Sequence, residues 1–402
     1  MGAFEENLRQ AFFRHVCQTS TEPLGITVAR ARGSKIWDVG GREYLDLLAG
    51  MGVANIGHAH PAVIAAIEKQ LTSYLHVAVY GEMIQQPQVE LARRLAEVTP
   101  GDLSVVYLTN SGTEAVEGAL KTARKYTGRS RFVAFAGAFH GDTFGALSVG
   151  GNPVYQEPFR PLLPDIQLLP FDDIAALKRI DASVAAVIVE PVQGEGGVRV
   201  PSAEFLPSLR QRCTEVGALL IADEVITGFG RTGRLFACEH WNVVPDIFVL
   251  AKALGGGMPL GAFVGRPEVM QTLSHDPSLA HVTTFGGHPV SCAAGLAALE
   301  FLLAERLADR AARIGAEWLE DLQAITNRVP CTTRGQGLLM ALQFETPAAT
   351  RRFVTRCFER GLILNWTLHR DTVVRLAPPL TISRDEIKHA SVMIAEALRC
   401  PL

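Results

Sequence analysis

The stretch ALLIADEVITGFGRTGRLFACEHWNVVPDIFVLAK, residues 218–252, decides the fold of this chain. It begins and ends with short apolar runs, ALLIAD (218–223) and IFVLAK (247–252), in which polar and apolar residues do not alternate. Strands covered by helices on both faces have this composition, so the runs predict two strands of a mainly parallel sheet. Their separation of roughly one βαβ unit makes them neighbours. Each run ends on a residue with useful chemistry, Asp223 and Lys252.

Four more apolar runs on either side of this stretch extend the predicted sheet. They are VVYLT (105–109), FVAF (132–135), VAAVIVE (184–190) and GAFVG (261–265). Helical patterns occur before them at about 61–73 and 87–98, and a long one follows over 289–325. The predicted fold class is therefore α/β, with a mainly parallel sheet flanked by helices.

The two ends of the chain differ from this central pattern. The first fifty residues hold short alternating pieces separated by glycine-bearing turns, which are typical of hairpin strands. After residue 290 the pattern is mixed and indicates a smaller α+β domain. We therefore expect an N-terminal segment (1–55) that packs with the small domain, a large domain (56–290) and a C-terminal small domain (291–402).

The composition argues against several classes of function. Of 402 residues, 48% are apolar and 20% are charged, as in globular enzymes. The 38 basic and 41 acidic residues leave a net charge of −3, so nucleic acid or a membrane surface is not an expected partner. No apolar run approaches the roughly 20 residues of a membrane-spanning helix. The seven cysteines are scattered without a CxxC pair, which favours free thiols in a reducing cytoplasm.

Asp223 and Lys252 are expected to meet, because the carboxyl ends of neighbouring parallel strands open onto one crevice. A desolvated lysine there has a lowered pKa and can act as an amine nucleophile. A pyridinium cofactor needs this pair, with the carboxylate keeping the ring nitrogen protonated and the amine binding the cofactor covalently. Taken singly, Asp223 could instead cap a helix, and Lys252 could be a solvent-reaching lysine at a helix start.

A possible anion site follows the 105–109 run, in the sequence Asn110-Ser111-Gly112-Thr113-Glu114. Two hydroxyls, a glycine backbone and a helix N-terminus together suit a phosphate, although the same pattern also serves as an ordinary helix cap. The chain has neither the G-x-x-x-x-G-K-[ST] pattern of a P-loop nor a G-x-G-x-x-G fingerprint after a strand. Nucleotide binding and a nicotinamide-dependent oxidoreductase are therefore disfavoured.

Two further clusters are open to more than one interpretation. Phe139-His140-Gly141-Asp142 follows the 132–135 run, and Phe139 could cover a flat cofactor ring or simply pack in the core. His58 and His60 have the spacing of metal ligands, but no nearby cysteine or carboxylate completes a set. No metal site is predicted.

Taken together, these residues resemble the class III pyridoxal-phosphate aminotransferases, the group of the ornithine, acetylornithine, 4-aminobutyrate and diaminopelargonate enzymes. The resemblance spans nearly the whole chain and implies a fold-type I transferase whose large domain binds the cofactor. Eight motifs carry it in order: IGHAHP (56–61), NSGTEAVEGALKTAR (110–124), FHGDT (139–143), EPVQGEGG (190–197), ADEVITGFGRTG (222–233), LAKALGGGMPLGA (250–262), TTFGGHP (283–289) and VRLAPPL (374–380).

The resemblance implies how the cofactor, pyridoxal 5'-phosphate, is held. Lys252 matches the lysine that bonds to it and later moves the substrate's proton, and Asp223 matches the acid at the ring nitrogen. Val225 and Phe139 match the residues on the two faces of the ring. His140 and Glu190, in the same motifs, belong to the expected cofactor-binding set.

The phosphate group and the quaternary structure are linked in this family. Ser111, Gly112 and Thr113 match the phosphate cup. Thr284 matches a threonine that reaches the phosphate from the neighbouring subunit, so the resemblance implies a homodimer.

Three residues are expected to bind substrates. Arg375 matches the arginine that clamps a substrate carboxylate, and Glu195 matches the acid that pairs with it in some members when the donor has no carboxylate there. Asp142 departs from the ornithine-type enzymes, which have an arginine after F-H-G, and should favour an amine. Ile226 replaces a common glutamine, and Gln193 could lie near the ring instead.

The expected activity is transfer of an amino group from an ω-amine or ω-amino acid to a 2-oxo acid, such as 2-oxoglutarate or pyruvate, by a ping-pong mechanism. An acetylornithine or ornithine aminotransferase proper is one alternative, and an aminomutase of the glutamate-semialdehyde type is another. A non-catalytic scaffold would be expected to lose Lys252 or Asp223, and both are present.

Overall fold

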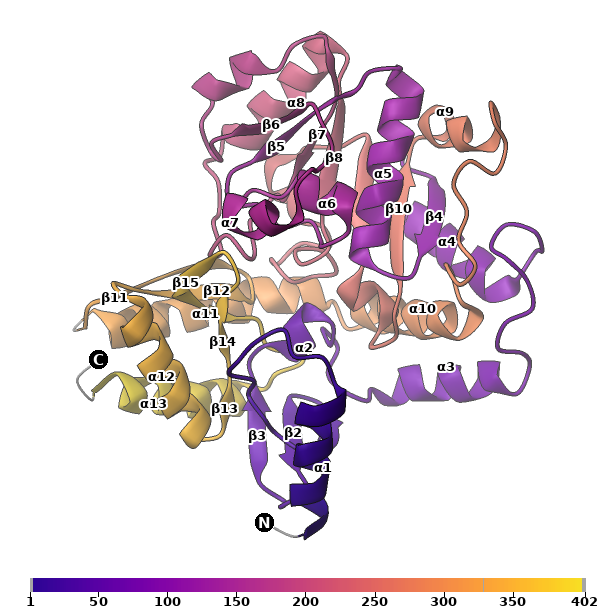
Figure 1. Ribbon diagram of the computed structural model, residues 1–402. Coiled ribbons are helices and arrows are strands. Elements are labelled where there is room, and N and C mark those ends of the chain that lie inside the picture. The colour runs from indigo at the N-terminus through magenta and orange to yellow at the C-terminus, as the bar shows by residue number, and fades with distance from the viewer. Residues whose placement is uncertain (1–2, 328, 400–402) are drawn as a thin grey trace.

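The apolar runs form a seven-stranded sheet in the computed structural model, which describes residues 3–327 and 329–399; the sheet lies in the upper part of the view in Figure 1. In spatial order its strands are β4 (Val105–Thr109), β10 (Gly261–Gly265), β9 (Ile247–Leu250), β8 (Leu219–Asp223), β7 (Val184–Val189), β5 (Arg131–Phe135) and β6 (Ile166–Leu169). The strands from β9 to β6 are parallel, whereas β10 is antiparallel to both of its neighbours. The predicted α/β class and mainly parallel sheet are confirmed.

Helices cover both faces of this sheet, as the lack of alternation in its strands predicted. On β5, Phe132 and Ala134 pack toward α5 (Gly112–Thr127), while Val133 and Phe135 pack toward α8 (Phe205–Val216). The strand is therefore buried on both sides between two helical layers.

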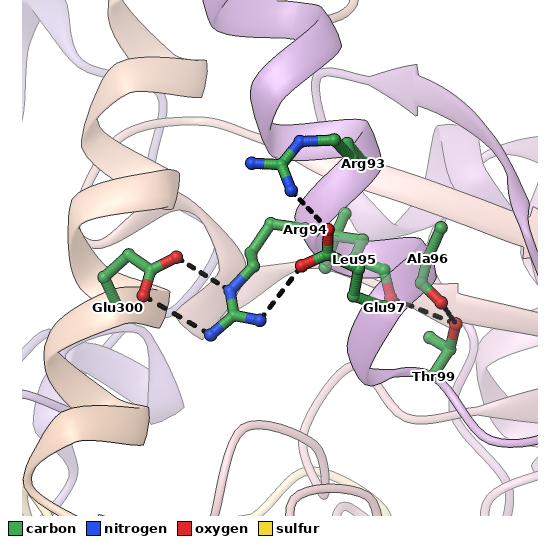
Figure 2. A network of polar contacts seen from close by, with 7 residues as sticks. All are labelled: Arg93, Arg94, Leu95, Ala96, Glu97, Thr99 and Glu300. Atoms are coloured by element: carbon green, nitrogen blue, oxygen red, sulfur yellow. Dashed lines mark hydrogen bonds and ion pairs between the residues drawn. The ribbon is translucent and has the colours of Figure 1, made fainter.

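Further helices lie beside the sheet, and two of them confirm the predicted patterns at 61–73 and 87–98. They are α3 (Pro61–Leu71) and α4 (Gln86–Val98), both in contact with α10 (Pro289–Ala304). Figure 2 shows the ion pair that joins α4 to α10, in which Arg94 Nε lies 2.7 Å from Glu300 Oε1. Within α4, Arg94 Nη1 also lies 3.1 Å from Glu97 Oε2. Such exposed pairs orient helices more than they stabilise them.

Two sequence expectations about these elements were wrong in detail, and one strand was not predicted. The long pattern at 289–325 forms two helices, α10 and α11 (Leu307–Thr326), because Arg306 adopts a left-handed φ of 50° between them. The edge strand β6 was not predicted, since its short sequence IQLL contains no β-branched residue after the first. The run 247–252 stops being a strand at Leu250.

Two smaller sheets contain the ends of the chain. The first orders β1 (Val28–Arg32), β2 (Lys35–Asp38), β3 (Glu43–Asp46) and β13 (Leu362–Ile363), and the second orders β11 (Cys331–Gln336), β12 (Leu339–Phe344), β15 (Arg370–Leu376) and β14 (Asn365–Thr367). The N-terminal hairpins are thus present, and β13 joins them to the C-terminal region by parallel pairing with β3. The division at residues 55 and 290 stays a prediction.

The remaining elements are short or lie at the termini. The α-helices are α1 (Ala3–His15), α2 (Ala49–Gly52), α6 (Phe144–Ser148), α7 (Pro153–Gln156), α9 (Pro267–Met270), α12 (Pro347–Glu359) and α13 (Arg384–Arg399). The 3-10 helices are η1 (Glu157–Phe159), η2 (Ala175–Arg179), η3 (Ala237–Trp241), η4 (Lys252–Gly255) and η5 (Gln271–Ser274). Because only η3 lies between β8 and β9, the expected βαβ connection contains no α-helix there.

A buried arginine ties the three regions together. Arg231, in the loop after β8, is fully buried and donates to the backbone oxygens of Leu338 and Pro378 and, at 2.6 Å, to Asn55 Oδ1. Burial lowers the pKa of Arg231 to about 9. Because these partners come from both ends of the chain, this side chain joins the N-terminal segment and the C-terminal region to the central sheet.

The cysteines form no disulfide within residues 3–327 and 329–399. Cys17 is exposed, and the other described thiols are buried at Cys213, Cys238, Cys292, Cys331 and Cys357. Cys400 lies outside the described residues. No described helix combines the length and the apolar composition that a bilayer crossing requires.

Candidate active site

A pocket of about 650 Å³ opens at the carboxyl ends of β7, β8 and β9. Parallel sheets bind ligands at this edge, because strand-end loops and helix N-termini meet there. The wall contains every expected site residue apart from Thr284. They are Ser111, Gly112, Thr113, Phe139, His140, Asp142, Glu190, Glu195, Asp223, Val225, Lys252 and Arg375.

Lys252 lines the pocket on the first residue of η4, with a left-handed φ of 48° that is strained for a residue bearing a Cβ. Among the described residues, no hydrogen bond or ion pair engages its amine. Burial lowers the pKa of Lys252, and Arg375 lowers it further, although Glu195 and Asp223 oppose the shift. The neutral, nucleophilic form of the amine is therefore favoured.

Asp223 ends β8 beside the buried ring of His140. Its Oδ2 lies 2.7 Å from His140 Nδ1, and its Oδ1 accepts a hydrogen bond of 3.0 Å from Val225 N. No helix begins here, so the helix-cap alternative for Asp223 is wrong. Nε2 of His140 is buried and has no hydrogen-bond partner among the described residues. An aspartate held by an imidazole in this way is fixed in orientation and can face a ligand.

The anion cradle forms at the N-terminus of α5. Ser111 is the N-cap, and its Oγ accepts a 3.3 Å hydrogen bond from Glu114 N, while Glu114 Oε2 accepts one of 2.7 Å from Asn110 N. Thr113 Oγ1 lies 2.7 Å from Thr143 Oγ1. The residues that cap α5 are thus the ones expected to bind an anion, since the free N–H groups of the first turn and the helix dipole both attract negative charge.

Two glycines let the walls of the cradle come together. A Cβ on Gly112 would lie 3.2 Å from the methyl groups of Val225, and a Cβ on Gly141 would overlap Thr113 Oγ1. Gly141 also has a φ of 123°, which side-chain-bearing residues rarely adopt. The backbone of 139–142 can therefore approach the start of α5 only because residue 141 is glycine.

Glu190 supports this loop from beneath. Its Oε1 accepts from Phe139 N at 3.0 Å, and its Oε2 accepts from Gly194 N at 2.9 Å. Burial raises the pKa of Glu190 to about 7, and the nearby charge of Asp223 adds to the shift. Glu190 thus positions Phe139, which with Val225 lines the pocket.

Arg375 and Glu195 form a buried ion pair between Nη1 and Oε1. The arginine, on β15, is 2% exposed, and its Nε has no hydrogen-bond partner in the described part of the chain. Burial alone would raise the pKa of Glu195, but the charge of Arg375 and the hydrogen bond from Leu368 N outweigh it and lower the pKa. The lowered pKa favours the ionised form of Glu195, whose negative charge lies against the guanidinium of Arg375.

The three other residues considered for substrate or ring contacts, Asp142, Ile226 and Gln193, differ in burial and in position relative to the pocket. Asp142 is exposed at the rim of the pocket, and Ile226 is buried in its wall. Gln193, which could have lain near the ring, instead contacts the loop after β5, where its Nε2 donates to Ala136 O at 3.0 Å. It does not line the pocket, and its amide is engaged by Ala136 O and by Arg199 Nη1, which donates to Gln193 Oε1 at 3.2 Å.

Thr284 lies outside this pocket, on an exposed segment before α10. Its neighbours Val282 and Phe285 are also exposed. The expected contact with a phosphate in the neighbouring subunit stays a prediction.

Sequence reasoning missed Met51, whose Sδ lies 3.9 Å from Arg375 Nη2. The four residues of α2 all have positive φ, and the carboxylate of Asp46 holds them by accepting from Leu48, Ala49 and Gly50 N–H groups. His58 Nε2 completes this support 2.7 Å from Asp46 Oδ2, so that histidine has a structural partner. The glycines on either side of Met51 were the signal for an unusual turn.

The residues present fit pyridoxal phosphate. The cradle at α5 suits its phosphate, Asp223 suits its ring nitrogen, and the unpaired amine of Lys252 suits its aldehyde. His140 lines the pocket, and its buried Nε2 has no hydrogen-bond partner among the described residues, as a polar atom with a place for a ligand would.

Comparison with known proteins agrees with this geometry. Residues 16–398 match the family Aminotransferase class-III. A putrescine aminotransferase from Pectobacterium atrosepticum is 44% identical, over 96% of this chain and 85% of that protein. An acetylornithine aminotransferase from Methanopyrus kandleri is also 44% identical, over 93% of this chain and 94% of that protein.

Solved structures show the same fold. An ornithine aminotransferase from Toxoplasma gondii superimposes with a TM-score of 0.91 at 35% identity, covering 98% of this chain and 94% of that one. An (S)-enantioselective omega-transaminase from Thermomicrobium roseum gives 0.91 at 33% identity, covering 99% and 98%. Fold and site together define a fold-type I transferase that depends on pyridoxal phosphate. The chain belongs to the class III aminotransferases and is a transaminase.

Proposed function

We propose that this transaminase takes amino groups from ω-amines, diamines such as putrescine in particular, and gives them to a 2-oxo acid such as 2-oxoglutarate or pyruvate. The observation that carries this proposal is the ion pair of Arg375 with Glu195. While Glu195 is paired with Arg375, the charge of the guanidinium is offset and does not repel an amine donor. When the 2-oxo acid binds, its carboxylate replaces Glu195 on Arg375. The carboxylate of Asp142 at the rim attracts the second ammonium of a diamine.

The roles of the other residues follow from their positions. Pyridoxal phosphate, when bound, supplies an electron sink that stabilises negative charge at the substrate carbon. Nζ of Lys252 would move the proton between that carbon and the cofactor, in opposite directions in the two halves of the exchange. The carboxylate of Asp223, oriented by His140 Nδ1, holds the ring nitrogen protonated. Phe139 and Val225 flank the ring.

The phosphate and the assembly belong to the same proposal. Ser111, Gly112 and Thr113 hold the phosphate, and Thr284 reaches it from the partner of a homodimer. Exposed apolar side chains support an interface, because large apolar patches on a surface mark association sites; Ile84 is 95% exposed and Leu279 is 69% exposed. The scattered free cysteines support a cytoplasmic location.

A donor panel tests the substrate assignment. Purified protein loaded with pyridoxal phosphate is given putrescine, N-acetylornithine, ornithine or 4-aminobutyrate, with 2-oxoglutarate or pyruvate as acceptor. We expect the largest kcat/KM with putrescine, and we expect Asp142→Arg to shift the preference toward 4-aminobutyrate or ornithine. A wild-type preference for acetylornithine or 4-aminobutyrate over every diamine would overturn the role of Asp142.

N-acetylornithine is the second candidate donor, because a relative at 44% identity carries that name. Its free carboxylate would need a cation in the donor orientation, and Arg375 is the cation that lines the pocket beside Lys252. The two candidates therefore differ in one measurable property: Arg375→Ala should spare the putrescine half-reaction and impair the acetylornithine half-reaction. Both relatives described above are aminotransferases, which favours transfer over the aminomutase alternative.

A further inference from the structure

The turn between β14 and β15 holds the second oxygen of Glu195. Leu368 N donates to Glu195 Oε2 at 2.7 Å, and His369 N donates to the backbone oxygen of Glu195 at 3.1 Å. Glu195 Oε1 pairs with Arg375, which lies on β15 a few residues beyond the same turn. The acid is therefore held on both sides by one hairpin of the C-terminal region.

This turn is fastened to the large domain by an exposed tyrosine. Tyr155 Oη, from α7, donates to Leu368 O at 2.7 Å, and its ring stacks on His369 with centroids 5.1 Å apart. His369 Nδ1 lies 3.2 Å from Gly137 O and donates to it, and the same ring meets the edge of Phe139 at 5.7 Å. Burial lowers the pKa of His369, which keeps the ring neutral and able to donate from one nitrogen only.

We propose that Tyr155, Leu368 and His369 form a latch that keeps Glu195 on Arg375, and that Tyr155 is thereby a positioning residue for the 2-oxo acid. The inference rests on the function proposed above for the ion pair. A carboxylate substrate must displace Glu195, and Glu195 leaves only by giving up both Arg375 and Leu368 N. Because the hydroxyl of Tyr155 holds the backbone of Leu368, the turn between β14 and β15 cannot move with the carboxylate of Glu195 when that carboxylate leaves Arg375. The latch therefore lowers affinity for the 2-oxo acid and favours donors that lack a carboxylate.

The test is Tyr155→Phe, which removes the hydroxyl and keeps the ring on His369. Glutarate is a dicarboxylate that does not react. We expect its Kd, measured by calorimetry, to fall about fivefold, the factor that corresponds to the net free energy of one hydrogen bond. The Michaelis constant for the acceptor 2-oxoglutarate should fall by a similar factor, while the half-reaction with putrescine keeps its rate. Tyr126→Phe is the matched control, because Tyr126 is 40% exposed against 38% for Tyr155 and does not line this pocket.

The direction of the change separates the latch from simple damage, because a loosened or misfolded site would bind glutarate more weakly. Unchanged or weaker binding in Tyr155→Phe overturns the latch. His369→Ala gives a second reading, since loss of its ring should also tighten glutarate. Glu195→Gln tests the proposed function separately. If this variant does not bind glutarate more tightly than wild type, the proposed exchange at Arg375 is wrong. If Glu195→Gln binds glutarate more tightly but Tyr155→Phe does not, the latch alone is rejected.

Discussion

Lys252 combines a left-handed backbone with a desolvated amine, and both features cost folding free energy before any cofactor is present. Asp223 is likewise buried beside His140, with one imidazole nitrogen left free. Residues that lower the stability of the fold thus line one pocket. This is the pattern expected where function rather than packing determines the side chains.

Replacing Lys252 should separate stability from activity. The lowered pKa means that the folded, cofactor-free protein binds a proton less well than the unfolded chain, so the penalty is present at neutral pH and disappears as pH rises toward the unfolded value. Lys252→Met should therefore raise the Tm of cofactor-free protein at pH 7, with a smaller gain at pH 10, and should reduce turnover by several orders of magnitude. Thermal unfolding at both pH values and a transamination assay measure this. Near-normal turnover would contradict the whole assignment.

The charge of Asp223 is tested by Asp223→Asn, which keeps the size of the side chain and removes its charge. We expect single-turnover conversion with putrescine to slow by about 10²–10³-fold, the usual cost of losing one preorganised electrostatic group. Cofactor retention should stay near that of wild type, because the cradle at α5 is untouched. Unchanged single-turnover rates would mean that Asp223 only supports the turn through Val225 N.

Among the elements, the strands were easier to predict than their directions. Apolar runs identify buried strands, and they gave β4, β5, β7, β8 and β10 close to their observed bounds. The direction of a strand depends on the segment that connects it to the strand before it. The sequence GAFVG therefore does not indicate that β10 is antiparallel to β9. The break at Arg306 was equally hidden, since a left-handed arginine follows from packing rather than propensity.

The start of α5 is a helix cap and the proposed phosphate site, and two Ser/Thr caps can separate these roles. Ser111→Ala and Thr346→Ala each remove a side chain that accepts from a first-turn N–H, at 3.3 and 3.2 Å. Each should lower stability by about 1 kcal/mol. Only Ser111→Ala should also raise the Kd of pyridoxal phosphate, measured by equilibrium dialysis. Equal cofactor affinity in the two variants would show that Ser111 is a cap alone.

For the molecule as a whole, the contacts that complete the site join residues far apart in the sequence and could not be predicted from it. The pairing of Arg375 with Glu195 was expected from the resemblance, but their support by Leu368 and Met51 required the folded chain. Backbone donors and left-handed turns leave little trace in a sequence. Thr284 illustrates the same point in another way, because its proposed contact with a phosphate would come from a neighbouring subunit and not from its own chain.

The proposed dimer predicts a difference between two exposed apolar residues. Phe285, beside Thr284, is 55% exposed, and Val392 on α13 is 57% exposed. Phe285→Asp should give a monomer that retains pyridoxal phosphate poorly, whereas Val392→Asp should stay dimeric and loaded. Sedimentation velocity with absorbance detection measures both properties. A fully active monomer would contradict the shared site.

Arg231 has a consequence for building chimeras between members of the family. Two of its acceptors, at Leu338 and Pro378, are backbone oxygens, so a transplanted C-terminal region can supply them whatever its side chains. Among the described residues, Asn55 provides the one side-chain acceptor that Arg231 uses. A graft should therefore succeed when the recipient keeps residues 55 and 231 as a matched pair. Exchanging the N-terminal segment without regard to Asn55 would leave Nη2 of a buried guanidinium without its acceptor, at a cost of about 1–3 kcal/mol.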